Sequence, residues 1–269
     1  METIKHLMWQ PTFSCKIKCK DCYVNKCKDK SKLISNNHIG VIEDLLLEND
    51  VYQFTISIDK DITNRLKNDI YRLIRVYDFL EESPKKNIWL TFHSVTNCIE
   101  FFDKIINSND ENYITPLISG ISISSLIGDL DFLCNNICKK YSIRLNLNLL
   151  INDEYNLVQD FLFCEGIDIV DSVYVICKKE PFGSPHESLV KSANECTKAY
   201  NDLNRYFPNK SIYLDNCLQC VLSTNTAKDC NSDITHLWPN NVRTKCPYNV
   251  NQLPNDNFNN CLFKELKCQ

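Results

Sequence analysis

Short apolar runs typical of β-strands alternate with longer helical patterns along most of this chain. Because such alternation forms βα units around a parallel sheet, we expect an α/β fold. From residue 215 the alternation stops and the sequence becomes rich in Asn, Pro and Cys, which predicts one domain over 1–214 and a small cysteine-rich extension over 215–269. The strands are predicted at 5–9, 53–59, 87–93, 120–124, 142–150, 170–177 and 211–214, and the helices at 38–47, 61–82, 98–106, 130–140, 153–164 and 187–206.

Four of the predicted strands carry polar side chains at every second position. Strands that helices cover on both faces are normally apolar throughout, so the polar face needs an explanation. An antiparallel sheet with one side in water would explain it, and so would a barrel whose lumen binds something polar. The interleaved helices favour the barrel. The positions expected to line its lumen are Ser57, Asp59, Ser122, Ser124, Asn146 and Asn148, with His93 near the rim.

Composition sets the broad class of the protein. The net charge of −4 gives no general attraction to nucleic acid or to anionic membranes. No stretch has the length and apolar character of a signal peptide or a membrane span, so a soluble, cytoplasmic protein is expected. Sixteen cysteines are then unusual, because cytosolic thiols are kept reduced and clustered ones more often bind metal. Single cysteines are expected to be small buried hydrophobic side chains, namely those at 98, 134, 138, 164, 177 and 196.

The first cysteine cluster directly follows the first predicted strand. Cys15, Cys19 and Cys22 have the spacing C-x3-C-x2-C. Structural zinc sites usually use two C-x2-C pairs, whereas three soft thiolates favour an iron–sulfur cluster. Three protein ligands would leave one iron with an open position, as in a catalytic metal site.

The segment from Pro11 to Tyr23 resembles the signature of the radical S-adenosylmethionine (SAM) superfamily, in which an aromatic residue follows the third cysteine. The resemblance implies that Cys15, Cys19 and Cys22 hold a [4Fe–4S] cluster and that SAM chelates its fourth iron. It further implies cleavage of SAM to methionine and a 5′-deoxyadenosyl radical, which takes a hydrogen atom from substrate. The implied fold is a partial (β/α)6 TIM-like barrel, and the implied electron donor is a flavodoxin or a ferredoxin.

Residues that would contact SAM also follow from this resemblance. The family commonly has a Gly-Gly-Glu-like stretch after its second strand, and this chain has Ser57-Ile58-Asp59-Lys60 instead. Each polar residue could equally be satisfied by its neighbours, without any ligand. The implied SAM contacts are Tyr23, Ser57, Asp59, Ser122, Ser124, Arg144, Asn146 and Asn148.

A second cysteine cluster lies in the extension. The stretch between Cys230 and Cys246 resembles the auxiliary-cluster segments called SPASM and twitch, in which a hydrophobic strand and a tight turn separate two cluster ligands. Here Pro239, Asn240 and Asn241 would make the turn, since Asn tolerates a left-handed backbone. The resemblance favours a second [4Fe–4S] cluster; structural zinc and unliganded thiols are the alternatives. The four candidate ligands are Cys217, Cys220, Cys230 and Cys246.

Two classes of function fit these features. The first is a radical SAM enzyme, an oxidoreductase acting on a peptide, a nucleotide or a small metabolite. The second is a non-catalytic iron–sulfur or zinc protein that acts in electron transfer or in binding. Cleavage of SAM by the anaerobically reconstituted protein would distinguish the two classes.

Overall fold

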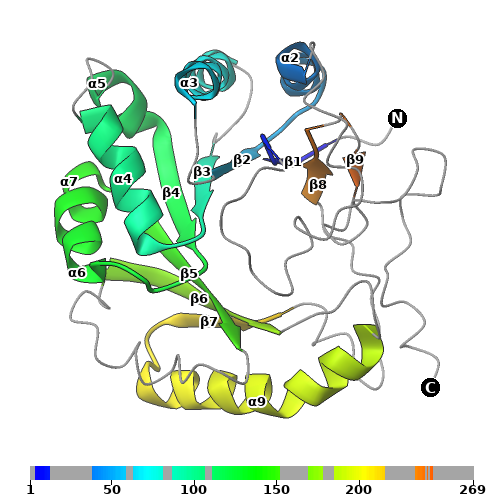
Figure 1. The fold of residues 1–269 in the computed structure, drawn as a ribbon, viewed down its shortest axis with the longest axis vertical. Coiled ribbons are helices and arrows are strands. Elements are labelled where there is room, and N and C mark those ends of the chain that lie inside the picture. The colour runs from blue at the N-terminus through cyan, green and yellow to red at the C-terminus, as the bar shows by residue number, and fades with distance from the viewer. Residues whose placement is uncertain are drawn as a thin grey trace. The chain divides into compact units, whose positions relative to one another are not determined.

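A computed structural model of the protein describes residues 4–12, 38–58, 63–80, 87–106, 111–151, 169–177, 185–215, 234–239, 241 and 243–244. These residues form a mixed α/β fold with a mostly parallel sheet of nine strands (Figure 1). The strand order is β7-β6-β5-β4-β3-β2-β1-β8-β9, so β1 to β7 lie in chain order. Among the described strands no pairing joins β7 to β9, and the sheet is not closed into a barrel.

The seven strands predicted from the sequence are confirmed, with ends shifted by a residue or two, and β8 and β9 add to them. Five of the six predicted helices are confirmed, and the sixth, at 153–164, lies outside the described residues. The strands are β1 (His6–Trp9), β2 (Gln53–Ile58), β3 (Asn87–Phe92), β4 (Ile118–Ile123), β5 (Arg144–Ile151), β6 (Val170–Cys177), β7 (Ser211–Leu214), β8 (Ile234–Leu237) and β9 (Arg243–Thr244). The helices are α2 (His38–Glu48), α3 (Asn64–Phe79), α4 (Val95–Ile106), α5 (Glu111–Ile114), α6 (Leu130–Phe132), α7 (Lys139–Tyr141) and α9 (Pro185–Tyr206), with a 3₁₀ turn at Thr115–Leu117 and a π-helical segment at Leu133–Cys138.

Polar side chains at helix ends explain where the structure departs from the predicted boundaries. Helix α3 starts later than predicted because the Thr63 hydroxyl accepts a hydrogen bond from the Leu66 amide at 3.2 Å. Helix α4 starts earlier than predicted because Ser94 Oγ accepts from the Asn97 amide at 3.2 Å. Ser142, with φ of 56°, ends α7 in the left-handed conformation, so β5 begins only at Arg144.

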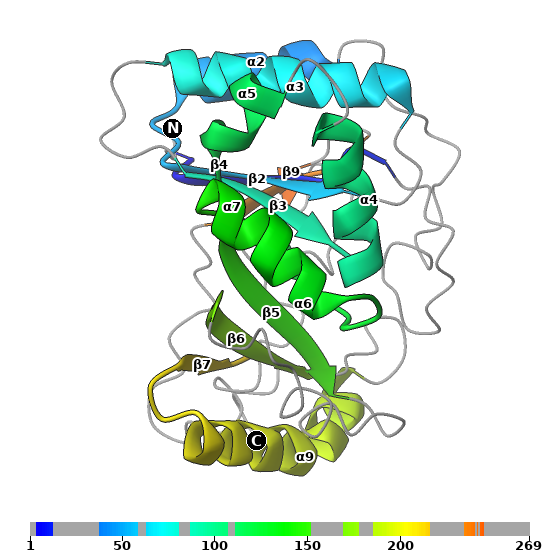
Figure 2. The ribbon, with the colours of Figure 1, turned by 90° about the vertical axis from the view of Figure 1, so that its left-hand side faces the viewer.

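The chain divides into two compact units, with the boundary inside α4 and β4. The first unit contains β1, β2, β3, β8 and β9. Strand β1 pairs in parallel with β2 on one side and with β8 on the other, and β2 pairs in parallel with β3. Helices α2 and α3 lie along one face of these strands (Figure 2). The buried side chains facing them include Leu7, Trp9, Phe54, Ile56 and Leu90.

Strands β8 and β9 form an antiparallel hairpin in the first unit. The turn predicted at Pro239–Asn241 is confirmed: the Asn241 amide donates to the Trp238 carbonyl at 2.9 Å, and Asn241 has a left-handed φ of 64°. The structure places β8 beside β1, with Trp9 opposite Leu237. The division into domains at residues 214 and 215 stays a prediction.

The second unit contains β5, β6 and β7, which pair in parallel in that order. Helix α9 runs along one face of these strands (Figure 1). That face is apolar, and α9 presents Ala193, Cys196, Ala199 and Leu203 as buried residues.

Single cysteines behave as predicted wherever the structure describes them. Cys98, Cys134, Cys138, Cys177 and Cys196 are buried free thiols, and Cys164 lies outside the described residues. Burial raises the pKa of Cys98 well above its ordinary value and raises that of Cys138 to about 12. Because the thiolate is the reactive form, these side chains serve the core rather than chemistry.

Candidate functional site

The cysteines of both predicted metal sites lie outside the described residues. So do Tyr23 and Asp59. Among the residues that the structure does describe, no group of three or more His, Cys, Asp or Glu side chains could hold a metal ion. None of the described helices has the length and apolar character of a membrane-spanning segment. What the structure provides is the framework that borders the cysteine segments. The predicted ligands outside it are Cys15, Cys19, Cys22, Cys217, Cys220, Cys230 and Cys246.

The first cysteine segment begins at the carboxyl end of β1. The Gln10 amide donates to the Leu237 carbonyl of β8 at 2.9 Å, and Gln10 Nε2 donates to the Thr12 carbonyl at 3.0 Å. These two hydrogen bonds therefore fix the position of Thr12 just after the carboxyl end of β1. In parallel α/β sheets the carboxyl ends of strands are where ligands bind.

The polar face predicted for β2 and β3 is formed, and His6 of β1, which lies opposite Gln53 of β2, extends it. His6 Nε2 lies 2.9 Å from Thr55 Oγ1, and Gln53 Nε2 donates to the same oxygen at 3.3 Å. Ser57, two residues closer to the carboxyl end of β2, is half-buried and lies opposite Thr91 of β3. Polar side chains thus satisfy one another near the amino end of this face, and Ser57 lies near its carboxyl end.

A buried indole occupies the same face. Trp89 of β3 is 8% exposed, and its ring lies directly over Gly120 of β4. A Cβ atom built on Gly120 would approach three ring atoms at 2.5 to 2.7 Å. Among the described glycines only Gly128 has a positive φ, so the backbone conformation does not explain glycine at 120. The closeness of the Trp89 ring does.

The predicted polar face of the second unit is also formed. Ser172 Oγ of β6 donates to Asn146 Oδ1 of β5 at 2.7 Å, and Asn148 is half-buried one row further on, opposite Tyr174. Tyr174 stacks on Tyr213 of β7 with ring centroids 4.9 Å apart. Burial raises the pKa of Tyr174. Asn146 therefore has a protein partner, which is the alternative explanation for its polar character.

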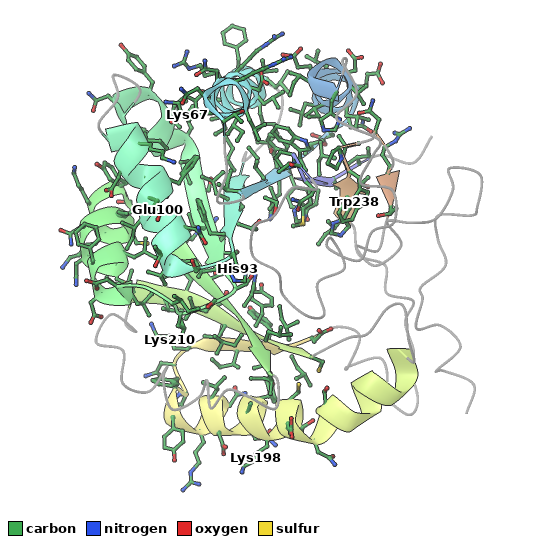
Figure 3. The ribbon with its side chains drawn as sticks, in the orientation of Figure 1. Lys67, His93, Glu100, Lys198, Lys210 and Trp238 are labelled. Carbon is green, nitrogen blue, oxygen red and sulfur yellow. The ribbon has the colours of Figure 1, made fainter. Side chains whose placement is uncertain are left out.

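The remaining predicted SAM contacts in the described residues are scattered along their strands. Ser122 is half-buried in β4, and Ser124 is exposed just after it. Arg144 is exposed at the first position of β5, at the opposite end of the strand from the carboxyl edge. His93 directly follows β3 and is labelled in Figure 3; burial lowers its pKa.

A buried carboxylate at the end of β7 was not predicted from the sequence. Asp215 is 8% exposed, and its Oδ2 accepts from the Cys177 amide at 3.2 Å. Its own amide donates to the Val175 carbonyl at 2.8 Å. Asp215 therefore holds the ends of β6 and β7 together, two residues before Cys217.

A hydrogen-bonded chain of three side chains was also not predicted from the sequence. Trp9 Nε1 donates to His38 Nε2 at 2.7 Å, and the other ring nitrogen of His38 contacts Asn241 Oδ1. Because an indole nitrogen can only donate, His38 Nε2 accepts and the imidazole proton is on Nδ1, facing the Asn241 oxygen. His38 is 1% exposed, and burial lowers its pKa. These residues come from β1, α2 and the hairpin turn, and no local sequence pattern marks their contact.

The comparisons with known proteins add no relative. No model of a protein family matches the chain, and no curated protein matches it.

Proposed function

We propose that this protein is a radical SAM enzyme. The observation that carries the proposal is the position of the C-x3-C-x2-C segment. Cys15, Cys19 and Cys22 follow Thr12, which leaves the carboxyl end of β1, and they precede α2. In a sheet whose strands β1 to β7 run in chain order, that edge is where a ligand site is expected. In more detail, we propose that the fold is a partial (β/α)6 barrel. Such a barrel requires neighbouring strands to follow one another in chain order, as β1 to β7 do.

The donor set fits an iron–sulfur cluster. Three thiolates are soft ligands, and three rather than four leave one iron available to a second ligand. When bound, the cluster would supply the electron that cleaves SAM and so starts radical chemistry on a substrate. The chain's own residues would hold SAM through short polar side chains, of which Ser57 is the described one near the carboxyl end of β2. Tyr23 and Asp59 are proposed contacts beside it.

We further propose a second metal centre in the extension. Cys230 precedes β8 by four residues and Cys246 follows β9 by two. The hairpin between them supports the proposed likeness to auxiliary-cluster segments, because a strand and a tight turn separate two ligands there. The substrate class stays open between a peptide, a nucleotide and a small metabolite, and the electron donor would be a flavodoxin or a ferredoxin.

Spectroscopy of the reduced cluster tests the proposal. The full-length protein is reconstituted anaerobically with iron and sulfide, reduced with dithionite, and examined by electron paramagnetic resonance with and without SAM. We expect a [4Fe–4S] signal that changes when SAM is added. A variant with Cys15, Cys19 and Cys22 all changed to Ala should lose the SAM-sensitive signal. The control Cys27→Ala should retain it, because Cys27 lies close by in the sequence but outside the C-x3-C-x2-C spacing. A signal that SAM leaves unchanged would favour an electron-transfer protein, and zinc without sulfide would favour a structural metal protein.

A further inference from the structure

Two tyrosines stack on each other in the second unit. Tyr174 of β6 lies directly opposite Tyr213 of β7, and their ring centroids are 4.9 Å apart with planes 23° from parallel. Their side chains are 37% and 45% exposed. Helix α9 covers the apolar face of these strands, so the tyrosines project from the other face. We propose that this face binds the nucleobase of a substrate other than SAM.

The choice of substrate rests on the proposed function, because it selects a nucleoside or a nucleotide from the substrate classes left open there. The binding site itself is argued from the second unit alone. Its residues come from β5, β6 and β7, and all of them lie in the described part of the chain.

The row of side chains that contains the two tyrosines continues onto β5, where Asn148 lies directly opposite Tyr174. The spacing of 4.9 Å between the rings matches the ordinary separation of neighbouring strands, about 4.8 Å, so the rings stand side by side along the row. A third ring at that spacing would stand over Asn148, within the range of about 4.5 to 7 Å that stacked aromatic rings prefer. The asparagine side chain is too short to take this place itself. We call the space beside Tyr174 and over Asn148 the base site.

The side chains around the base site favour an uncharged planar ring. Towards the amino ends of the strands, Asn146 and Ser172 form a hydrogen bond with each other and carry no charge. Towards the carboxyl ends, Leu150 of β5 is 40% exposed on the same face. A charged group would lose hydration here without gaining a partner of opposite charge, whereas a neutral ring would gain contact with Tyr174 and Leu150.

Asn148 distinguishes a nucleobase from a hydrocarbon ring. Its side chain is half-buried, and within the described part of the chain its amide group has no hydrogen-bond partner. An amide carries an acceptor oxygen and a donor nitrogen side by side, which is the pattern that pairs with the edge of a nucleobase. A phenyl ring in the same place would leave both groups unpaired, so the amide favours the nucleobase.

Four variants separate stacking from hydrogen bonding. Tyr174→Leu removes the ring on which the base would stack, whereas Tyr174→Phe keeps it. Asn148→Ala removes the amide. Asn148→Phe fills the base site with a third ring, which should extend the stack and exclude a ligand. The control is Tyr113→Leu, at an exposed position of α5 in the first unit.

Binding of adenosine, guanosine, cytidine and uridine to the full-length protein is measured by equilibrium dialysis, and thermal unfolding is followed for every variant. We expect at least one nucleoside to bind. Its dissociation constant should rise about tenfold in Tyr174→Leu, the effect of losing one stacked ring, and by a similar factor in Asn148→Ala. Tyr174→Phe and Tyr113→Leu should stay within about twofold of the unchanged protein. Asn148→Phe should abolish binding without lowering the midpoint of thermal unfolding.

The inference is overturned if no nucleoside binds, or if Tyr174→Leu and Asn148→Phe leave nucleoside binding unchanged. It is also overturned if N-acetyltryptophanamide binds as tightly as the nucleosides and is insensitive to Asn148→Ala, since the site would then take an aromatic side chain of a peptide. Binding of SAM to the reconstituted protein should be the same in Tyr174→Leu as in the unchanged protein. Weaker SAM binding in that variant would assign the site to the cofactor and overturn the inference.

Formation of 5′-deoxyadenosine from SAM, measured on the same reconstituted protein, separates this inference from the proposed function. Nucleoside binding that depends on Tyr174 and Asn148, in a protein that forms no 5′-deoxyadenosine, would support the base site and defeat the radical SAM proposal. Cleavage of SAM by a protein that binds none of the four nucleosides would do the reverse.

Discussion

The contact between Trp89 and Gly120 predicts an unusual response to a single methyl group. In Gly120→Ala, the added Cβ would lie 2.5 Å from Cη2 and Cζ3 of the indole, and 2.7 Å from Cζ2. Carbon atoms pack best at about 3.5 to 4.0 Å, so the buried ring must move by about 1 Å. Overpacking of this kind costs about 1 to 3 kcal/mol, which outweighs the roughly 0.5 to 1 kcal/mol that Ala gains over Gly inside a strand.

The matched background is Trp89→Phe, because a phenyl ring lacks the far edge of the indole that meets the new methyl. There, Gly120→Ala should become neutral or stabilising by about 0.5 kcal/mol. Urea denaturation of the four proteins gives a double-mutant cycle, and we expect a coupling free energy of about 2 kcal/mol. Equal destabilisation by Gly120→Ala in both backgrounds would show that the indole does not lie over Gly120.

Three further predictions concern other described contacts and the second cluster. Tyr77→Phe removes the hydroxyl that donates to the buried Val51 carbonyl at 2.8 Å, and should lower the free energy of unfolding by about 1 to 2 kcal/mol, whereas Tyr113→Phe at an exposed position should change it little. Burial lowers the pKa of both His38 and His93 in the folded state, so the unfolded chain takes up these protons first as pH falls below the ordinary value of 6.5. Each imidazole should lower the free energy of unfolding by at most about 1.4 kcal/mol per pH unit below that pH, and a stability that is flat between pH 7 and 5 would contradict two buried neutral imidazoles. In protein lacking Cys15, Cys19 and Cys22, metal analysis should find about four irons per chain from the second centre, while roughly one zinc without sulfide would make it a structural site.

Local patterns in the sequence were sufficient to predict the strands and the longer helices, because each has several residues with a consistent period. Strand β8 is different. Ile234–Leu237 is four residues long in an Asn- and Cys-rich stretch, and it was expected only through the resemblance to auxiliary-cluster segments. Its partner, β1, lies more than two hundred residues earlier, and no local pattern encodes such a pairing.

The polar faces show both the use and the limit of alternation. The period of two identified Asn146 as a residue on the polar face of its strand. It could not show that Ser172 satisfies Asn146 across the sheet, because the polar residues Asp171 and Ser172 of β6 are adjacent and do not alternate with apolar ones.

Contacts between distant segments were beyond sequence reasoning. Trp9 and His38 read separately as an apolar strand residue and a polar helix residue. Their hydrogen bond, and that of His38 with Asn241 across 203 positions, forms only when β1, α2 and the hairpin turn are brought together. Buried polar groups need partners, and here the partners come from three different elements.

Formation of 5′-deoxyadenosine from SAM is the most direct test of the proposed function. The reconstituted full-length protein is incubated with SAM and dithionite under anaerobic conditions, and 5′-deoxyadenosine and methionine are measured by chromatography. We expect both products in equal amounts from the unchanged protein and from Cys27→Ala, and neither above background from the variant in which Cys15, Cys19 and Cys22 are changed to Ala. Cleavage of SAM by that triple variant at the rate of the unchanged protein, or no cleavage by the unchanged protein when its cluster is fully loaded, would contradict the assignment.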